Sequence, residues 1–379
     1  MLNRRVVASM AMLMPGLAVA EHSWKTEFIA RGSQISTENK TTYIQGEENY
    51  SKYSIDRARI GFRGDVSSTL SYNFRLRFEE SKYATTAANG QSLAFDKAYI
   101  DHKPFKNLTL RLGRMTPVAG GGWDYYYLSD KDLDGLSRGA GVSVKYGLGA
   151  HDLHLSILNN FGDNKVMVDL TTPADTSVEV RTDDPLIGLS YEGSFGPASV
   201  RASYWMQNLP AIRPVGSTDV IQTKSVTQTY YSLAARAEIA GVNVAAATQS
   251  MTTPAKLYLH TEATGGLDVP GEKDIVNSST SFELAYTVGQ ITPVFMYFTE
   301  EVNSIAGRDS AGALTYKDNI RTGYSAAVQF APKSDGITYF LLYKNLTESV
   351  ELPSGTNPDD EITTTMSVGF TSMISSASK

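Results

Sequence analysis

The sequence lacks cysteine, and beyond its N-terminus it lacks any long hydrophobic run. The absence of cysteine excludes a disulfide scaffold, a thiol nucleophile, and zinc or iron–sulfur sites with cysteine ligands. No apolar stretch after the N-terminus approaches the ~20 residues that a transmembrane helix needs, so a helical membrane protein is not expected. The formal net charge of −6 argues against a broadly basic surface that binds nucleic acid.

The first 20 residues have the pattern of a secretory signal peptide. Arg4 and Arg5 precede the apolar run 6–13, and Ala18-Val19-Ala20 is a small-x-small cleavage site. We expect the mature chain to begin at Glu21; the alternative is the first helix of a cytosolic domain. Loss of two arginines leaves 34 − 2 = 32 basic residues against 40 acidic ones, a mature charge of −8. Such an exported chain is periplasmic, secreted or embedded in an outer membrane.

Apolar and polar residues alternate with a period of two along the chain, and helical periodicity is almost absent. The run 57–79 gives two examples of this pattern. Its apolar residues share one face of two successive strands: Ala58, Ile60, Phe62, Val66, Leu70, Tyr72, Phe74, Leu76 and Phe78. Its polar residues share the other face: Arg57, Arg59, Arg63, Asp65, Ser71, Asn73, Arg75, Arg77 and Glu79. The pattern predicts β-strands with one apolar and one polar face.

Short turns alternate with long polar loops between these strands. The expected short turns are 65–69, 104–107, 147–151, 193–197, 239–241, 289–291 and 331–336. The expected long loops are 37–51, 81–92, 117–138, 161–183, 208–227, 252–277, 303–318 and 345–361. Seven turns and eight loops make fifteen connections, and therefore sixteen strands.

An even strand number with loops of unequal length is typical of outer-membrane barrels, which have short periplasmic turns and long extracellular loops. In lipid a sheet must close, because an open edge leaves backbone groups unpaired. The sequence therefore predicts an all-β fold, a transmembrane antiparallel β-barrel of about sixteen strands over residues 21–379. The alternative is a soluble β-sandwich, which has long loops at both ends.

Two segments resemble a known family. Residues 57–64 (RARIGFRG) and 95–114 (FDKAYIDHKPFKNLTLRLGR) are similar to the phosphate-selective porin O and P family of Gram-negative bacteria. The resemblance implies a sixteen-stranded, trimeric outer-membrane pore, and it implies transport of anions or phosphate. Two features differ from that family: the chain ends on Lys379 rather than on an aromatic residue, and its loops are acidic. The acidic loop residues are Glu47, Glu48, Asp183, Asp184, Asp359, Asp360 and Glu361.

Six arginines lie on the polar faces of neighbouring strands: Arg57, Arg59, Arg63, Arg75, Arg77 and Arg111. Across the 65–69 turn we expect Arg57 near Arg77 and Arg59 near Arg75. Opposed like charges destabilise a sheet, and rings of Arg or Lys in pores select anions. The arginines are therefore the predicted pore-lining, anion-binding residues. The alternative is structural: a polar interior in which they pair with Asp65, Glu79 and Asp101.

The third long loop, 117–138, is the predicted constriction loop. Its Gly120-Gly121-Gly122 permits a tight fold. Its aromatic residues are expected to pack it against the wall, and its aspartates are expected to face the arginines. The predicted constriction-loop residues are Asp124, Tyr125, Tyr126, Tyr127, Asp130, Lys131, Asp132 and Asp134. Such opposed charges fit a general diffusion pore. The alternative is an ordinary exposed loop.

No cofactor is expected, although Asp130, Asp132 and Asp134 resemble the first half of a calcium loop. That loop requires Glu at its twelfth position, where this chain has Gly141. Catalysis also has little support, because the chain lacks G-x-S-x-G and phosphate-loop motifs. His151 and His154 are three residues apart on a strand and should point to opposite faces.

These features predict a passive porin, not an enzyme, in the outer membrane of a Gram-negative bacterium. Its lumen should favour small anionic or polar solutes, phosphate or other oxyanions among them. The expected partners are outer-membrane lipid and two further copies of the chain in a homotrimer; no nucleic acid is expected. The alternatives are a general diffusion porin with weak selectivity and a structural or adhesive barrel that forms no pore.

Overall fold

The computed structural model describes residues 22–38, 49–80, 91–118, 139–159, 164–168, 176–180, 184–209, 226–253, 274–308, 314–332, 336–352 and 360–375. The predicted signal peptide, residues 1–20, lies outside these ranges. Within them, no helix has the length and hydropathy to cross a membrane.

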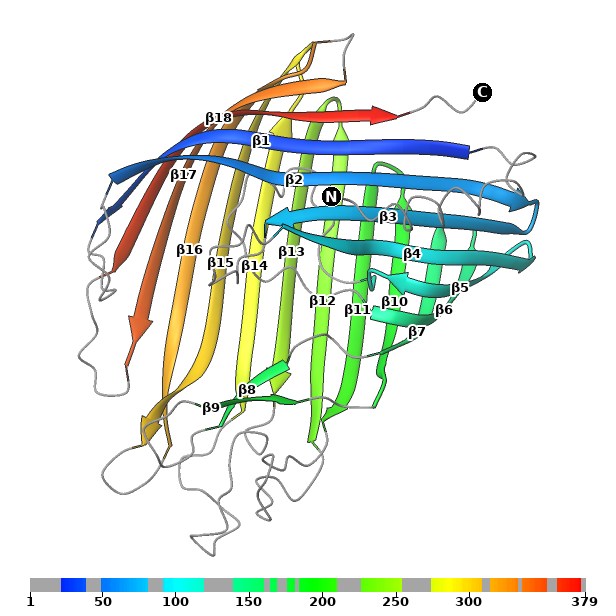
Figure 1. Cartoon of the computed structure of the whole chain (residues 1–379), viewed down its shortest axis with the longest axis horizontal. Coiled ribbons are helices and arrows are strands. Elements are labelled where there is room, and N and C mark those ends of the chain that lie inside the picture. The colour runs from blue at the N-terminus through cyan, green and yellow to red at the C-terminus, as the bar shows by residue number, and fades with distance from the viewer. Residues whose placement is uncertain are drawn as a thin grey trace, which may run out of the picture.

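Sixteen strands form one closed antiparallel barrel (Figure 1). In chain order they are β1 His22–Glu38, β2 Asn49–Ser67, β3 Leu70–Glu80, β4 Gln91–Phe105, β5 Leu108–Met115, β6 Gly139–Leu148, β7 His151–Leu158, β10 Leu186–Phe195, β11 Ala198–Leu209, β12 Val226–Ile239, β13 Val242–Thr253, β14 Ile275–Tyr286, β15 Ile291–Arg308, β16 Leu314–Phe330, β17 Ile337–Glu351 and β18 Glu361–Ser375. The barrel closes where β1 pairs with β18, from Lys25 opposite Ser375 to Glu38 opposite Ile362. The predicted sixteen-stranded barrel is confirmed.

Several of the expected loops contain strand structure; in 345–361, for example, β17 continues to Glu351. The 161–183 loop includes a hairpin outside the barrel, β8 Asn164–Val168 with β9 Thr176–Val180. The 303–318 loop is mostly strand, because β15 and β16 stay paired from Asn303 opposite Asp318 to Arg308 opposite Leu314. Polar residues therefore do not mark the ends of these strands, since backbone pairing continues beyond them.

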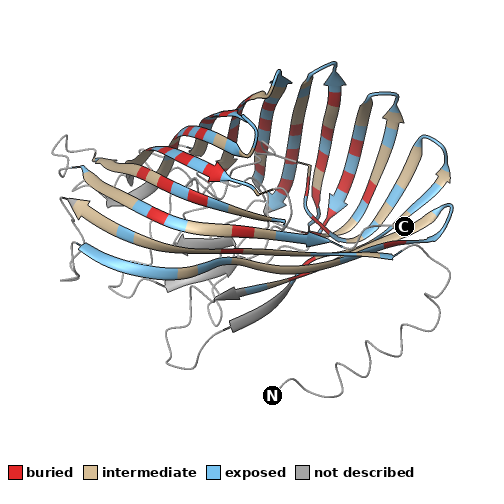
Figure 2. Cartoon of the chain, turned by 90° about the horizontal axis from the view of Figure 1, so that it is seen from above, coloured by how far each residue is buried: buried red, intermediate tan, exposed pale blue. Residues whose placement is uncertain are grey.

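The side chains alternate between an outer face and an inner face of the wall. On β14 and β15, the outward Phe282 and Phe295 are exposed, whereas the inward Glu283 and Met296 are buried. Figure 2 shows the same alternation of buried and exposed residues along many strands. An apolar outer face suits lipid. The inner face carries polar residues such as Glu283 together with a cluster of buried apolar residues that includes Met296.

The predicted faces of β2 and β3 are confirmed, but their predicted register is wrong. Phe62 lies opposite Phe74 on the outer face, as the pattern required. On the inner face Arg59 lies opposite Arg77, not opposite Arg75. The turn was centred too early: the strands pair as far as Ser67 opposite Leu70, with a bulge after Asp65. A shift of two residues keeps each side chain on its face, because the pleat also repeats every two residues.

Candidate functional site

Arginines gather on the inner face of β2 and β3, beside β1 and β4. Arg59 lies opposite Arg77 on β3 and opposite Glu27 on β1. Its guanidinium nitrogens are 3.7 Å from a Glu27 carboxylate oxygen and 3.3 Å from one of Asp96. Arg75 also forms an ion pair with Asp96. The two carboxylates therefore offset part of the repulsion between the arginines.

Asp96 reaches these arginines because of a β-bulge in β4. Arg75 pairs with Lys97, and the next residue, Leu76, pairs with Phe95, so Asp96 is the extra residue between them. A bulge re-aims the side chain of the extra residue. The Asp96 residue is 1% exposed, between two guanidiniums that hold it in place.

A second bulge, on β2, also turns a carboxylate toward the inner face. Arg57 pairs with Ile29 and Ile55 pairs with Ala30, which leaves Asp56 as the extra residue. Its carboxylate forms a 2.8 Å ion pair with Arg31 of β1. Bulges thus supply the inner wall with carboxylates that regular alternation would place outside.

The ion-pair partners differ from those expected in the structural alternative. Asp101 does pair with an arginine, whereas Asp65 lies opposite Ser71. The side chain of Glu79 lies outside the described residues. The arginines of β2 and β3 use Glu27 and Asp96 instead, and Arg57 joins the group through Glu27.

The sequence contains a signal for the Asp96 bulge. Phe95 and Ile100 are five residues apart on β4, yet both are exposed on the outer face. Unbroken alternation cannot place residues with an odd spacing on one face. The extra residue must therefore lie between them, and Asp96 is within that interval.

Arg63 and Arg111 have contacts of their own. Arg111 of β5 makes two hydrogen bonds to Asp101, from Nε at 2.7 Å and Nη2 at 2.9 Å. Its guanidinium also lies 3.9 Å from the centre of the Tyr99 ring. Arg63 donates to Ser23 Oγ at 3.0 Å, near the short-turn end of the barrel. The structure therefore brings Arg57, Arg59, Arg75 and Arg77 together and gives the other two predicted residues separate partners.

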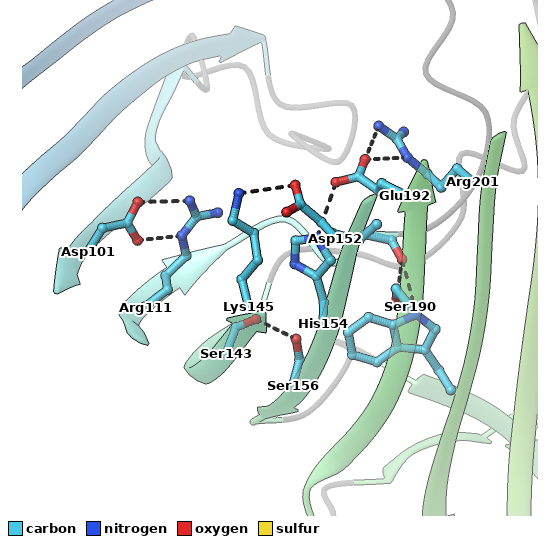
Figure 3. A network of polar contacts seen from close by, with 12 residues as sticks. Asp101, Arg111, Ser143, Lys145, Asp152, His154, Ser156, Ser190, Glu192 and Arg201 are labelled. Carbon is cyan, nitrogen blue, oxygen red and sulfur yellow. Dashed lines mark hydrogen bonds and ion pairs between the residues drawn. The ribbon is translucent and has the colours of Figure 1, made fainter. Parts of the chain in front are cut away.

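A row of polar contacts continues along the inner wall from β4 to β11 (Figure 3). After the Arg111–Asp101 pair, Lys145 lies 3.1 Å from Asp152, His154 lies 3.3 Å from Glu192, and Arg201 also pairs with Glu192. Apart from the face of His154, the positions of Lys145, Asp152, Glu192 and Arg201 were not predicted from the sequence. Glu192 and Arg201 flank a short turn on the same face, which is the signal that could have paired them.

His151 and His154 lie on opposite faces of β7, as expected. His154 is buried on the inner face beside Glu192. The ring of His151 stacks on Tyr191 on the outer face, with a centroid distance of 5.9 Å. The two rings therefore cannot share one metal ion.

The chain that leaves β5 is held against the inner wall of β10 and β11. The Val118 carbonyl accepts a 2.8 Å hydrogen bond from Ser190 Oγ and a 3.4 Å bond from Trp205 Nε1. Pro117 beside it is buried. Residues 119–138 lie outside the described residues, so the course of this loop stays a prediction. Its predicted residues are Asp124, Tyr125, Tyr126, Tyr127, Asp130, Lys131, Asp132 and Asp134.

The calcium alternative falls on the same undescribed loop, at Asp130, Asp132 and Asp134. Within the part of the chain that the structure describes, no three or more His, Asp or Glu residues form a group that could hold a metal ion. Calcium therefore stays an alternative, without support from the described residues.

A model of the phosphate-selective porin O and P family matches residues 30–265. The chain belongs to this family. Its fold is shared by solved porin structures, of which the outer-membrane channel DcaP of Acinetobacter baumannii has a TM-score of 0.57 at 11% identity, covering 93% of this chain and 98% of that one. The anion-selective porin of Comamonas acidovorans has a TM-score of 0.54 at 13% identity, covering 94% and 100%.

A trimer form of OmpT of Vibrio cholerae is also similar, with a TM-score of 0.55 at 13% identity, covering 94% of this chain and 99% of that one. No protein of curated function matches the sequence. The predicted family and the localisation in a Gram-negative outer membrane are confirmed. Family and fold together point to a channel rather than an enzyme.

Proposed function

We propose that this porin is a passive channel for small solutes, with a preference for anions that include phosphate and other oxyanions. The observation that carries the proposal is a charge imbalance on the inner face of β1–β4. Arg57, Arg59 and Arg75 form ion pairs with the carboxylates of Glu27 and Asp96, and Arg77 lies opposite Arg59. Arginines outnumber carboxylates in this group of described side chains, and from this excess we infer that this part of the wall is positive.

The position of these charges determines how strongly they act on a passing ion. Charges that are exposed to salt water are screened beyond about 8–10 Å at physiological ionic strength. Charges beside a low-dielectric wall are screened less, and they act where a passing ion loses part of its hydration. The wall should therefore outweigh the acidic loops in selecting ions. The family and its anion-selective structural neighbour support the same reading.

Reversal potentials in planar bilayers under a KCl gradient test the proposal. Replacing Arg59, Arg75 and Arg77 together by Gln should shift the permeability ratio toward cations. The control is Arg31→Gln with Asp56→Asn, which removes a neighbouring ion pair without changing the net charge. An unchanged reversal potential in a folded triple variant would mean that the arginines are structural.

A general diffusion porin with weak selectivity is the second candidate. Arg321 on β16 lies between Glu300 at 3.0 Å and Glu348 at 2.6 Å, so carboxylates outnumber the cation in these ion pairs. Opposite charge excesses on different strands produce an electric field across the lumen. Such a field orients dipolar solutes, and a pore of this kind lets both cations and anions pass. A wild-type reversal potential close to zero would favour this candidate. The absence of stepwise conductance would favour a structural or adhesive barrel instead.

We further propose that the porin is a homotrimer in outer-membrane lipid. The support is its similarity to the trimer form of OmpT and the exposed apolar outer face of the barrel. The mass of the detergent-solubilised protein tests the assembly. A monomeric mass would remove the trimer proposal and leave the channel proposal intact.

A further inference from the structure

Three aromatic residues on the inner wall each lie directly opposite a glycine of the neighbouring strand. Trp205 of β11 faces Gly188 of β10. Phe298 of β15 faces Gly323 of β16, and Phe340 of β17 faces Gly369 of β18. All six residues belong to the inner face, because the neighbours before and after them in sequence point outward. The same pairing thus occurs at three separate places around the barrel.

Each aromatic ring occupies the space that a side chain on its glycine would need. A Cβ atom at Gly188 would lie 2.0 Å from Cε3 of Trp205. At Gly323 it would lie 2.3 Å from Cε1 of Phe298. At Gly369 it would lie 2.4 Å from the backbone oxygen of Ala30 and 2.6 Å from Cζ of Phe340. These separations are far inside the ~3.5–4.0 Å at which carbon atoms pack. Any residue other than glycine must displace the ring or the strand.

The glycines are not needed for their backbone freedom. Gly188, Gly323 and Gly369 are not among the described residues with positive φ, unlike the turn glycine Gly241 at φ 82°. Their backbone conformation is therefore open to any residue. What the three positions require is the absence of a side chain.

The rings are buried in the wall and contribute little to the surface that faces the lumen. Trp205 is 0% exposed, Phe298 is 4% exposed and Phe340 is 3% exposed. A large ring without a recess would stand away from the wall, toward the barrel axis, because inner-face side chains project inward. The glycines therefore let the wall accommodate large rings.

We propose that Gly188, Gly323 and Gly369 are sockets that set the bore of the pore. Each socket keeps one aromatic ring out of the path of solutes. A side chain added at the glycine pushes the ring inward and narrows the lumen, whereas removal of the ring widens the lumen. This inference rests on the proposed channel function, but it concerns the size of solutes and not their charge. It therefore does not depend on the arginines of β2 and β3.

Liposome swelling with neutral sugars of increasing size tests the proposal. Gly323→Ala should lower the size cut-off and the single-channel conductance. Gly369→Ala is a less direct test, because its Cβ would also meet the backbone oxygen of Ala30. Phe298→Ala and Phe340→Ala should raise the cut-off and the conductance, because they vacate the socket without refilling it. The matched control is Gly61→Ala: Gly61 lies on the inner face of β2, where a Cβ has its nearest neighbour at an ordinary 3.5 Å.

The outcomes separate the socket proposal from the channel proposal. A wild-type protein that passes no sugar overturns the channel itself. A folded Gly323→Ala variant with the wild-type cut-off overturns the socket proposal, as does a change equal to that of Gly61→Ala. If Gly323→Ala does not fold, the Phe298→Ala and Phe340→Ala variants test the proposal, and an unchanged cut-off in both of them overturns it.

Discussion

At the scale of single residues, the position of one carboxylate determines how four arginines can coexist. Asp96 is in contact with Arg59 and Arg75 at once, and it is almost completely buried. A buried charge is expensive unless opposite charges compensate it. The two guanidiniums supply that compensation, and in turn they depend on Asp96 for theirs. The group is therefore stable as a whole and sensitive to the loss of one member.

We expect Asp96→Ala to destabilise the folded barrel. Removing one partner of a buried ion pair costs about 3–5 kcal/mol, because it leaves uncompensated charge behind. Urea unfolding of the refolded protein in detergent or lipid measures this cost. Asp56→Ala is the control, since the side chains of Asp56 and Arg31 are 22% and 20% exposed and their pair should contribute less than that of the buried Asp96. Equal losses in the two variants would contradict a special role for Asp96.

At the scale of strands, the period-two pattern determines the face of every residue until a bulge interrupts it. On β3 the outward ring of Phe74 contacts Phe95, with ring centroids 5.2 Å apart. Asn73, one residue earlier, lies on the inner face opposite Arg63. Neighbouring positions thus face lipid and lumen, and they should respond differently to the same charge.

Phe74→Arg should destabilise the barrel much more than Asn73→Arg. Arginine on the lipid face near the membrane midplane costs roughly 2–4 kcal/mol, and less toward an interface. Arginine at position 73 enters the polar interior, where water solvates it despite the nearby Arg63. Unfolding midpoints of the two variants, compared with wild type, measure the difference. Similar losses would show that the assigned faces of β3 are wrong, because a one-residue slip exchanges them.

The sequence was sufficient to predict the strand number and the faces of β2 and β3, because alternation and loop length report directly on lipid exposure. It was not sufficient to predict the register at the first turn, since alternation is unchanged by a shift of two residues. The bulges at Asp56 and Asp96 were missed because each displaces a single residue without interrupting the strand. The partners Glu27 and Asp96 could not be found without the register. The ends of β15 and β16 were missed because backbone pairing continues beyond the polar residues.

At the scale of the whole molecule, closure of β1 on β18 places charges from distant parts of the sequence around one lumen. The net charge therefore says little about the charge that a solute meets. The mature chain is expected to carry 32 − 40 = −8, with many acidic residues in loops. The inner face of β1–β4 carries the opposite imbalance. The two sets of charges should favour opposite ions.

Salt concentration separates the two contributions. The Debye length falls from ≈ 10 Å at 0.1 M to about 3 Å at 1 M, which removes the long-range attraction of cations by exposed loops. The wall charges act at contact distance and are screened less. We therefore expect the anion-to-cation permeability ratio to rise as salt rises at a fixed gradient. Reversal potentials at 0.1 M and 1 M measure it; a ratio that is below unity at 0.1 M and only approaches unity at 1 M would mean that the acidic loops, and not the arginine wall, determine selectivity.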